Sequence, residues 1–565
     1  MIIHINDYRH LFDGDDATLA VQEALVTCRK NPGSTLKLGG GELNFYKKYA
    51  FEKEYYISNN DYGKKSIVFP LIGMKNLTID GEGADLLFHG EVLPFVMDGS
   101  EQITLKNFKV DYPQPHFFQA DIIAAGENFV ELEYDTREFN LRVQGRRLVF
   151  FSREDEWEIM LDKVLVTEFD KETVSPSAYI PPYFVYLPEK SDGSFLSSMY
   201  RYVRAIQLAD NRIRFEGKFG HTHIVGNKWV CTLGLERKNP GIFGNRTKDI
   251  LFQDITLHQT AAMGVICQLC ENITLENVKA VPREGSGRFL SVSADATHFV
   301  NCSGVVKYEG CTFTNMLDDA GNVHGIYMKC AKKLNDTTLL LTFGHYQQKG
   351  LNLYDTGDKI RIIDSCDMTA VAELTVKNSY LISGDFLRLE CYETLPEMGA
   401  GFAVENFTKM PELYINNCIC GYNRPRGFLL STWKKTVVTN NIFYNMSSGL
   451  VFTGDCTDWF ESGPVNDVII KNNKFRNAAY AGGTAIRIVP HVVCGDTPYH
   501  RNITIEDNEF EMHEKRFLYA RHVENLVFRN NRFIQNDSLP AHGEIGAEGL
   551  DVNETCRSVV VQSCF

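Results

Sequence analysis

The chain has 565 residues and a formal charge of −14 at pH 7. Its length predicts more than one domain, and its acidic balance argues against nucleic acid or an anionic membrane as the main partner, because both attract basic surfaces. A neutral substrate fits better, and the 37 Phe and 25 Tyr suit a β-rich core and the stacking of aromatic rings on sugars.

The segment from Met1 to Asp16 lacks a basic region followed by a long apolar run, so no signal peptide is expected. No window approaches the roughly 18 apolar residues of a membrane-spanning helix. We therefore expect a cytoplasmic protein, or a secreted or periplasmic one if an export signal has been trimmed. The fifteen cysteines are odd in number and scattered, which predicts reduced core thiols rather than a disulfide framework or a zinc site.

The N-terminal region predicts a helix that covers one end of a larger β structure. In the stretch DDATLAVQEALVTCR, acidic residues precede apolar positions at helical spacing, so Asp15 or Asp16 is expected to cap the helix. A helix in this place would hide a strand edge that could otherwise pair with other chains.

A short motif recurs along most of the chain: an apolar–x–apolar strand, a pair that includes Asn or Asp, and an apolar anchor. It occurs in ITLKNFKV (103–110), ILFQDITL (250–257), ITLENVKA (273–280), ELYINNCI (412–419), VVTNNIFY (437–444), VIIKNNKF (468–475), ITIEDNEF (503–510) and LVFRNNRF (526–533). Alternation with period two indicates a strand, and paired Asn or Asp residues indicate a turn with left-handed backbone. The anchors Phe510 and Phe533 are 23 residues apart, whereas Phe443 and Phe475 are 32 apart.

Coils of about 23 residues with short strands predict an all-β fold, a right-handed parallel β-helix with an apolar interior and hydrogen-bonded Asn ladders. An antiparallel sandwich is the alternative, but the same turn after the same strand disfavours it. Residues 115–245 and 330–399 lack the Asn turns and contain long alternating strands. We interpret both as small inserted antiparallel β-barrel-like modules, which divides the chain into 1–114, 115–245, 246–329, 330–399 and 400–565.

Three aspartates carry the functional prediction. Asp295 precedes Asp318 by 23 residues, one coil, so the two are expected to stack about 4.8 Å apart with Asp319 displaced sideways from Asp318. Repulsion among the three carboxylates should raise the pKa of at least one of them. Glycoside hydrolysis requires a neutral carboxylic acid and a carboxylate close together, which such a cluster could supply. A solvated turn and a calcium site are the alternatives. His298 and His324 beside the same carboxylates favour catalysis.

Several stretches together resemble glycoside hydrolase family 110: NLTIDGEGADLLFHG, PFVMDGSEQITLKNFKVDY, NPGIFGN, SADATHFVNCSG, MLDDAGNVHG, GFAVENFTKMPELYINN and GDCTDWFESG. The resemblance implies an exo-acting, inverting α-1,3-galactosidase that needs no metal or other cofactor. Its implied substrates are blood-group B type and linear Galα1-3Gal structures. It also implies that Asp295, Asp318 and Asp319 carry catalysis. By analogy with polygalacturonase-like enzymes, Asp318 would be the general acid, and the other two would position and deprotonate water.

Nine further residues are predicted to bind the sugar: Arg283, Glu284, His298, Asn322, His324, Arg424, Arg426, Trp459 and Glu461. The structural alternatives are salt bridges for the charged residues and a buried loop anchor for Trp459. The expected partner is a glycan with terminal α-galactose, without nucleic acid or membrane partners, and a homodimer through the modules is left open. A polygalacturonase-like hydrolase, a polysaccharide lyase and a non-catalytic carbohydrate-binding β-helix are the alternative functions, and the charge of −14 argues against the first two.

Overall fold

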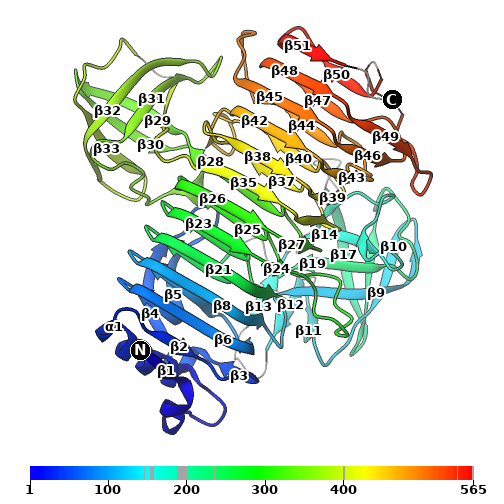
Figure 1. Cartoon of the computed structure of the whole chain (residues 1–565). Helices are drawn as coiled ribbons and strands as arrows, with labels where there is room; N and C mark the ends of the chain where they lie inside the picture. The colour runs from blue at the N-terminus through cyan, green and yellow to red at the C-terminus, as the bar shows by residue number, and fades with distance from the viewer. Residues whose placement is uncertain are drawn as a thin grey trace.

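The computed structural model describes residues 1–145, 147–152, 158–187, 200–233, 237–398, 401–543, 545–546 and 548–562. Its frame is a right-handed parallel β-helix with the two termini at opposite ends (Figure 1). Strands of successive coils pair in three parallel ladders, which confirms the predicted fold class.

Two of the ladders belong to one sheet. The first pairs β2 (Thr35–Lys37), β6 (Lys75–Phe88), β8 (Glu101–Asp111), β21 (Lys248–Leu257), β23 (Glu271–Glu276), β26 (Ser303–Glu309), β35 (Glu412–Asn416), β38 (Thr436–Thr439), β42 (Asn466–Lys471), β45 (His500–Glu506), β48 (Val523–Arg529) and β51 (Arg557–Val561). The second runs from β3 (Glu42–Phe45) through β6, β8 and β21 to β24 (Lys279–Ala280), β27 (Thr312–Thr314), β36 (Ile419–Gly421), β39 (Ile442–Tyr444), β43 (Lys474–Arg476), β46 (Glu509–Met512) and β49 (Arg532–Gln535).

The third ladder supports the candidate site. It pairs β5 (Tyr62–Ile72), β7 (Leu93–Asp98), β20 (Ile242–Asn245), β22 (Val265–Gln268), β25 (Thr297–Val300), β28 (Gly321–Ile326), β37 (Phe428–Leu430), β40 (Leu450–Phe452), β44 (Ile486–Ile488), β47 (Leu518–Ala520) and β50 (Leu550–Val552). The hairpin strand β4 (Phe51–Tyr56) is antiparallel to β5 at the N-terminal end of this ladder.

Asn and Asp pairs form the turns between the first two ladders, as predicted. The first residue of a pair is left-handed, with φ of 59° at Asn440 and 56° at Asn472. The second points into the interior and joins a ladder of side chains. Asn441 Nδ2 donates to Asn473 Oδ1 at 2.9 Å, and Asn473 Nδ2 donates to Asn508 Oδ1 at 3.0 Å. The ladder therefore satisfies polar groups that the coil stacking buries.

Aromatic anchors stack inside the β-helix beside the Asn ladder. Phe443 pairs in register with Phe475, and Phe510 with Phe533, as the repeat predicts. The ring centroids of Phe475 and Phe510 are 4.9 Å apart at an angle of 9°. The spacing of the motif along the sequence therefore correctly predicts which aromatic anchors stack on each other in the core.

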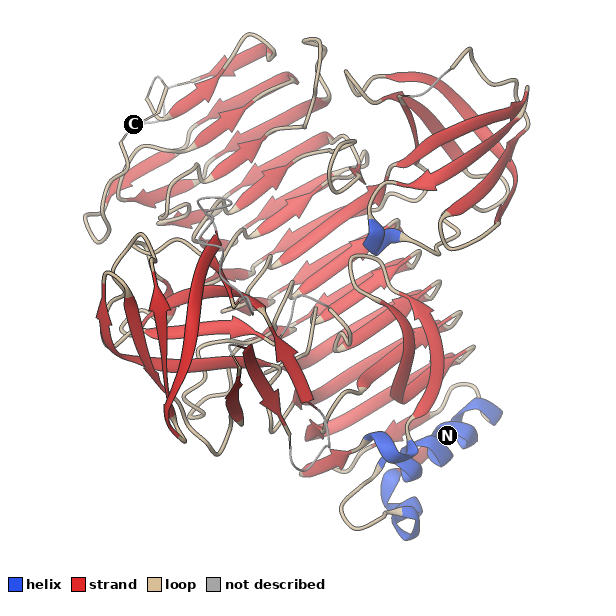
Figure 2. Ribbon diagram, turned by 180° about the vertical axis from the view of Figure 1, so that it is seen from behind, coloured by secondary structure: helices blue, strands red, loops and turns tan. Residues whose placement is uncertain are grey.

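Two modules leave the β-helix between coils and extend from opposite sides of it (Figures 1 and 2). The first contains β9 (Phe117–Gly126), β10 (Phe129–Glu133), β14 (Lys163–Asp170), β15 (Ser175–Pro176), β16 (Tyr183–Tyr186), β17 (Tyr200–Ala209), β18 (Arg212–Gly217) and β19 (Lys228–Thr232), with a separate sheet of β11 (Leu141–Gln144), β12 (Arg147–Phe151) and β13 (Glu158–Leu161). Its strands are antiparallel except for the pair β16 and β17.

The second module is a closed barrel. Its strands are β29 (Met328–Asn335), β30 (Thr338–Phe343), β31 (Lys359–Asp364), β32 (Ala370–Leu381), β33 (Phe386–Cys391) and β34 (Phe402–Asn406). The boundary expected at residues 399–400 lies outside the described residues.

The N-terminal helix α1 (Thr18–Lys30) packs against the first coils, next to β1 (Ile2–His4) and the short helix η1 (Ile5–Leu11). The N-cap residue is Ala17 and not Asp15 or Asp16 as expected, but the backbone N–H of Thr18 donates to the Asp16 carboxylate at 2.8 Å. No helix within the described ranges has the length and apolar character needed to span a bilayer.

The expectation that all cysteines are reduced is wrong at one place. Cys366 in the second module forms a disulfide with Cys494, in the loop after β44. The two lie 128 residues apart, so their spacing gave no indication of the pair. Twelve other described cysteines are free, and ten of these are buried in the core as expected.

Replacing Asn473 with Ala should destabilise the β-helix. Asn473 is 1% exposed and links both neighbours in its ladder, so the substitution leaves buried partners unsatisfied. We expect a loss of about 1–3 kcal/mol in the free energy of unfolding, measured by urea titration. Asn466→Ala is the control, because Asn466 accepts one exposed ladder bond from Asn502, and it should cost under about 0.5 kcal/mol. Equal losses would contradict a stabilising role for the buried ladder.

Candidate functional site

Three aspartates meet beside the third ladder, but the register differs by one residue from the expected one. Thr297 pairs with Gly321, so this coil has 24 residues instead of 23. Asp319 therefore stacks on Asp295, its backbone N–H donating to the Asp295 carboxyl at 3.3 Å, and Asp318 is the displaced residue. One oxygen of each carboxyl lies within 4.8 Å of the others. The predicted cluster exists, with the roles of Asp318 and Asp319 in the stack exchanged.

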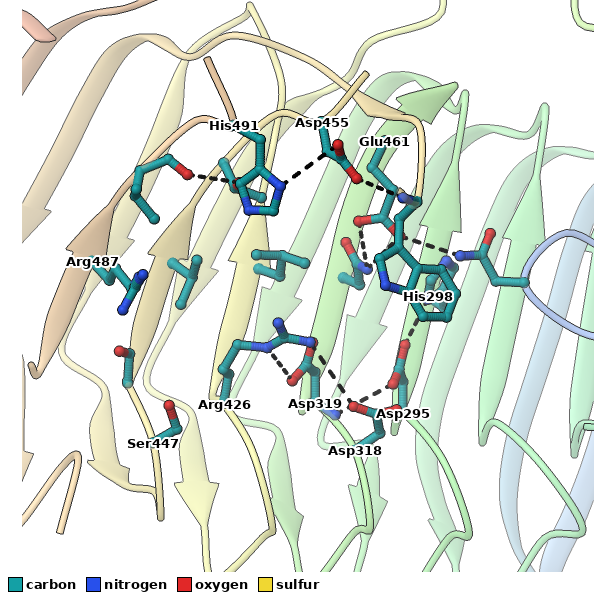
Figure 3. A pocket seen from close by; sticks show the side chains of 18 of the residues that line it. Asp295, His298, Asp318, Asp319, Arg426, Ser447, Asp455, Glu461, Arg487 and His491 are labelled. Carbon is teal, nitrogen blue, oxygen red and sulfur yellow. Dashed lines mark hydrogen bonds and ion pairs between the residues drawn. The ribbon is translucent and has the colours of Figure 1, made fainter. Parts of the chain in front are cut away.

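Arginines from two different parts of the chain face this cluster (Figure 3 shows Arg426). Arg237 Nη2 lies 2.6 Å from Asp318 Oδ2. Arg426 holds both oxygens of Asp319, at 2.9 and 2.8 Å, and Arg424 Nη2 lies 3.8 Å from Asp318. Because three guanidinium groups already balance the carboxylates, the calcium alternative is disfavoured.

The three carboxyls differ in acidity. Burial raises the pKa of Asp295 to about 7 and that of Asp319 to about 8, and the charge of Asp318 adds to both shifts. Burial acts on Asp318 as well, but Arg237 and Arg424 outweigh it and hold the Asp318 pKa below its ordinary value. Near neutral pH the cluster therefore keeps a proton on Asp319, Asp295 is between its protonated and ionised forms, and Asp318 is ionised.

A chain of hydrogen bonds runs from Asp295 into the interior. His298 Nδ1 lies 2.6 Å from Asp295 Oδ2, and His298 Nε2 lies 2.9 Å from His324 Nε2. His324 Nδ1 donates to the carbonyl of Gly325 at 2.7 Å, so Nε2 is the His324 nitrogen that faces His298. When Asp295 is protonated, its carboxyl donates to His298 Nδ1, and the Nε2 proton of a neutral His298 is directed at His324 Nε2. This arrangement agrees with burial, which keeps the His298 pKa well below its ordinary value.

Glu461 brings a further carboxylate to the site from β41 (Glu461–Ser462), which pairs with β28. Its Oε1 accepts from Asn59 Nδ2 at 3.2 Å and lies 3.5 Å from His324 Nε2. Asn322 Nδ2 donates to both of its oxygens at 3.4–3.5 Å. Amide and carboxylate groups of this kind can bind sugar hydroxyls as donors and acceptors.

His298, His324 and Glu461 form a second group whose ligand atoms lie within 4.8 Å of one another. Two imidazoles and a carboxylate are a ligand set that zinc can use. However, the proton between the two Nε2 atoms already accounts for their 2.9 Å contact. The sequence prediction of a metal-free site therefore stays a prediction.

These residues surround a cavity of about 350 Å³ (Figure 3). Of the twelve predicted site residues, eight line it: Asp295, His298, Asp318, Asp319, Asn322, Arg426, Trp459 and Glu461. Trp459 is 40% exposed, and the centroid of its ring lies 4.4 Å from the centroid of the His345 ring. Asp455 accepts the backbone N–H groups of the turn that carries Trp459, which holds the indole over the cavity.

The remaining four predicted residues lie elsewhere. His324 is buried behind His298, as described. Arg424 lines a second cavity, of about 460 Å³, that adjoins the first. Arg283 pairs with Asp111 and Glu284 is exposed, and neither lines either cavity. The structure does not bring these two residues to the aspartate cluster, because the loop after β24 directs Arg283 toward the carboxylate of Asp111 at the end of β8.

Sequence reasoning missed eleven residues that line the cavity, among them Asn59 and Arg237, which contact the carboxylates of Glu461 and Asp318. Neither belongs to the coil repeat, so the spacing argument that located the aspartates could not reach them. Arg237 stands two residues before the NPGIFGN stretch, the only indication of its importance that the sequence offered.

The second module matches a known domain family, and nearly the whole chain is similar in sequence to known proteins. The GLAA-B beta-barrel domain II family matches residues 338–399, inside the second module. The alpha-1,3-galactosidase A of Shewanella woodyi is 33% identical and covers 93% of this chain and 84% of its own length. The alpha-1,3-galactosidase B of Bacteroides thetaiotaomicron is 30% identical, over 100% of this chain and 90% of its own.

Among solved structures, the A-module of the Azotobacter vinelandii mannuronan C-5 epimerase AlgE6 covers 99% of both chains at a TM-score of 0.40 and 10% identity. At that level of likeness, nothing about substrate or chemistry transfers. The two α-1,3-galactosidases do establish the family, since each matches nearly the full chain at 30% identity or more. The chain belongs to the family of the α-1,3-galactosidases A and B, glycoside hydrolase family 110.

Proposed function

We propose that the protein is an exo-acting, inverting hydrolase that removes terminal α-1,3-linked galactose from blood-group B type or linear Galα1-3Gal glycans. The observation that carries the proposal is a cluster of three aspartates of unequal acidity in a sugar-sized cavity. Glycoside hydrolysis needs a proton donor and a carboxylate within reach of one sugar, and this cluster supplies both. The family of the chain supports galactose as that sugar.

We assign the general acid to Asp318, because Asp318 lines both cavities and so lies between the galactose and the leaving sugar. Asp295 and Asp319 then hold the attacking water. In the free protein Arg237 keeps Asp318 ionised, so a proton must reach Asp318 in the substrate complex. Coupled carboxyls share their protons, and substrate hydroxyls that engage Arg237 would favour this transfer.

The stereochemical outcome needs a direct test. Carboxyl groups lie about 5–5.5 Å apart in retaining enzymes and about 6.5–9.5 Å apart in inverting ones, and a three-membered cluster with contacts under 4.8 Å fits neither range. Inversion is supported instead by the two carboxyls that can hold one water. Proton NMR during hydrolysis of the linear and branched glycans should show β-galactose first. Initial α-galactose would overturn inversion, and no galactose from either glycan would overturn the function.

Replacing any one of the three aspartates with Asn should lower kcat by about 10²–10⁴-fold, because each substitution removes either the general acid or one of the two groups that activate water. Galactose binding should persist, measured by calorimetry. Asp385→Asn, on the second module and paired with Lys349, is the matched control and should retain full activity. If the protein only binds carbohydrate, the unaltered protein will release no galactose. If the Asp318→Asn variant stays active, Asp318 is not the general acid.

The activity should depend on pH close to neutrality. Hydrolysis needs one proton in the cluster and one ionised carboxylate to activate water. Below about pH 7 a second proton enters, because the Asp295 pKa is raised to about 7, and above about pH 8 the last one leaves, because the Asp319 pKa is raised to about 8. We expect kcat/KM to fall on both sides of this interval. An acid limb near about pH 4, where ordinary carboxyls titrate, would contradict the cluster as described.

A further inference from the structure

His298, His324 and Glu461 converge beside the first cavity. The Nε2 atoms of the two histidines are 2.9 Å apart, and Nε2 of His324 is 3.5 Å from Oε1 of Glu461. One ligand atom of each residue lies within 4.8 Å of the others. A tetrahedral zinc ion with bonds of about 2.0–2.1 Å holds its ligand atoms about 3.3 Å apart, which falls between the two measured distances. Small side-chain movements would therefore bring the three atoms to the spacing of zinc ligands.

Both imidazoles are held in the orientation that metal-bound histidines adopt. A histidine that binds a metal directs its other ring nitrogen at a carboxylate or a backbone carbonyl, which fixes the ring. Nδ1 of His324 donates to the carbonyl of Gly325 at 2.7 Å, and Nδ1 of His298 lies 2.6 Å from the Asp295 carboxyl. In each ring Nε2 is therefore the nitrogen left to face the other ring.

Glu461 brings a negative charge that lacks a strong cationic partner. Arginines balance Asp318 and Asp319, whereas the ion pairs of the described residues include no Lys or Arg at Glu461. Asn59 and Asn322 donate to its oxygens, but neutral amides do not cancel its charge. Because a buried carboxylate costs free energy unless a cation matches it, a divalent ion would stabilise this group.

Zinc held by these residues would keep one coordination position open to the cavity. His298 and Glu461 line the cavity, whereas His324 is buried behind His298 (Figure 3). Asn322 Oδ1, also at the cavity, is buried without a hydrogen-bond partner and is available to accept from a water on the metal. The ion and its water would then take up volume that the sugar needs.

We propose that His298, His324 and Glu461 bind a zinc ion, and that this ion inhibits the hydrolase. The inhibition rests on the proposed function above, whereas the binding of the ion does not. Zinc takes the Nε2 lone pair of both rings, so the Nε2 proton of His298 moves to Nδ1 and is donated to the Asp295 carboxylate. A proton carried by Asp295 leaves to solvent. The ion therefore ties up one of the two aspartates that hold the attacking water.

The test uses the full-length protein after its metals are removed with EDTA. Calorimetry with zinc chloride should show one ion per chain, and cobalt(II) should give the visible absorption of a four-coordinate site with nitrogen and oxygen ligands. Glu461→Gln and His324→Gln should each weaken zinc binding at least about a hundredfold, because even groups that only support a ligand are worth about 10–100-fold. The melting temperature of each metal-free variant checks its folding, and Glu461→Gln decides if His324→Gln does not fold.

His491→Gln is the matched control. His491 lines the same cavity but lies 3.6 Å from Asp455 instead of in this group, so the substitution should leave the zinc affinity unchanged. Three results would overturn the site: no zinc binding to the unaltered protein, full affinity in Glu461→Gln, or a loss in His491→Gln alone, which would place the ion with Asp455.

The inhibition has its own readout. Saturating zinc should lower the rate of galactose release from Galα1-3Gal at least about a hundredfold, the worth of one acid or base group, and EDTA should restore the rate. Galactose should in turn weaken zinc binding, since both need the cavity. Zinc binding with an unchanged rate would overturn the inhibition. A metal-free protein that releases no galactose would instead overturn the hydrolase function and leave the metal site intact.

Discussion

Thr297 pairs with Gly321 across neighbouring coils, and backbone pairing of this kind decides which residues can meet in the site. Parallel strands lie about 4.8 Å apart, so side chains at matching positions are in contact however the chain travels between them. The same ladder continues from Asn322 to Leu429 across the entire second module without losing register. Residues far apart in sequence, such as Asp319 and Arg426, become neighbours for this reason alone.

The stacking concentrates negative charge where water has little access, and the fold tolerates this by pairing. A buried carboxylate costs free energy unless it is protonated or matched by a cation. The site uses both solutions: Asp295 shares a proton with His298, whereas Asp318 is matched by Arg237. The two solutions leave adjacent carboxyls with different affinities for a proton, which is the asymmetry that acid–base chemistry requires.

The sequence predicted the coils, the Asn ladders and the aspartate cluster, because each repeats a local rule at fixed spacing. It misplaced the stack by one residue, since a single additional residue in one turn is invisible to a spacing argument and exchanges the places of Asp318 and Asp319. The contact of Arg237 with Asp318 spans 81 residues and the disulfide of Cys366 spans 128, and neither Arg237 nor Cys366 belongs to the repeat. Arg283 lies outside both cavities, because proximity to Asp295 along the chain does not determine which way the side chain points.

Both modules begin and end at neighbouring coils. The strands before and after each module therefore pair directly, as consecutive coils of the β-helix. A relative could therefore acquire, discard or reshape such an excursion while the carboxyl groups keep their positions. Selectivity for the glycan and the capacity to cleave it would then be inherited separately. The same architecture offers protein engineers an exchangeable lobe on a fixed chemical platform.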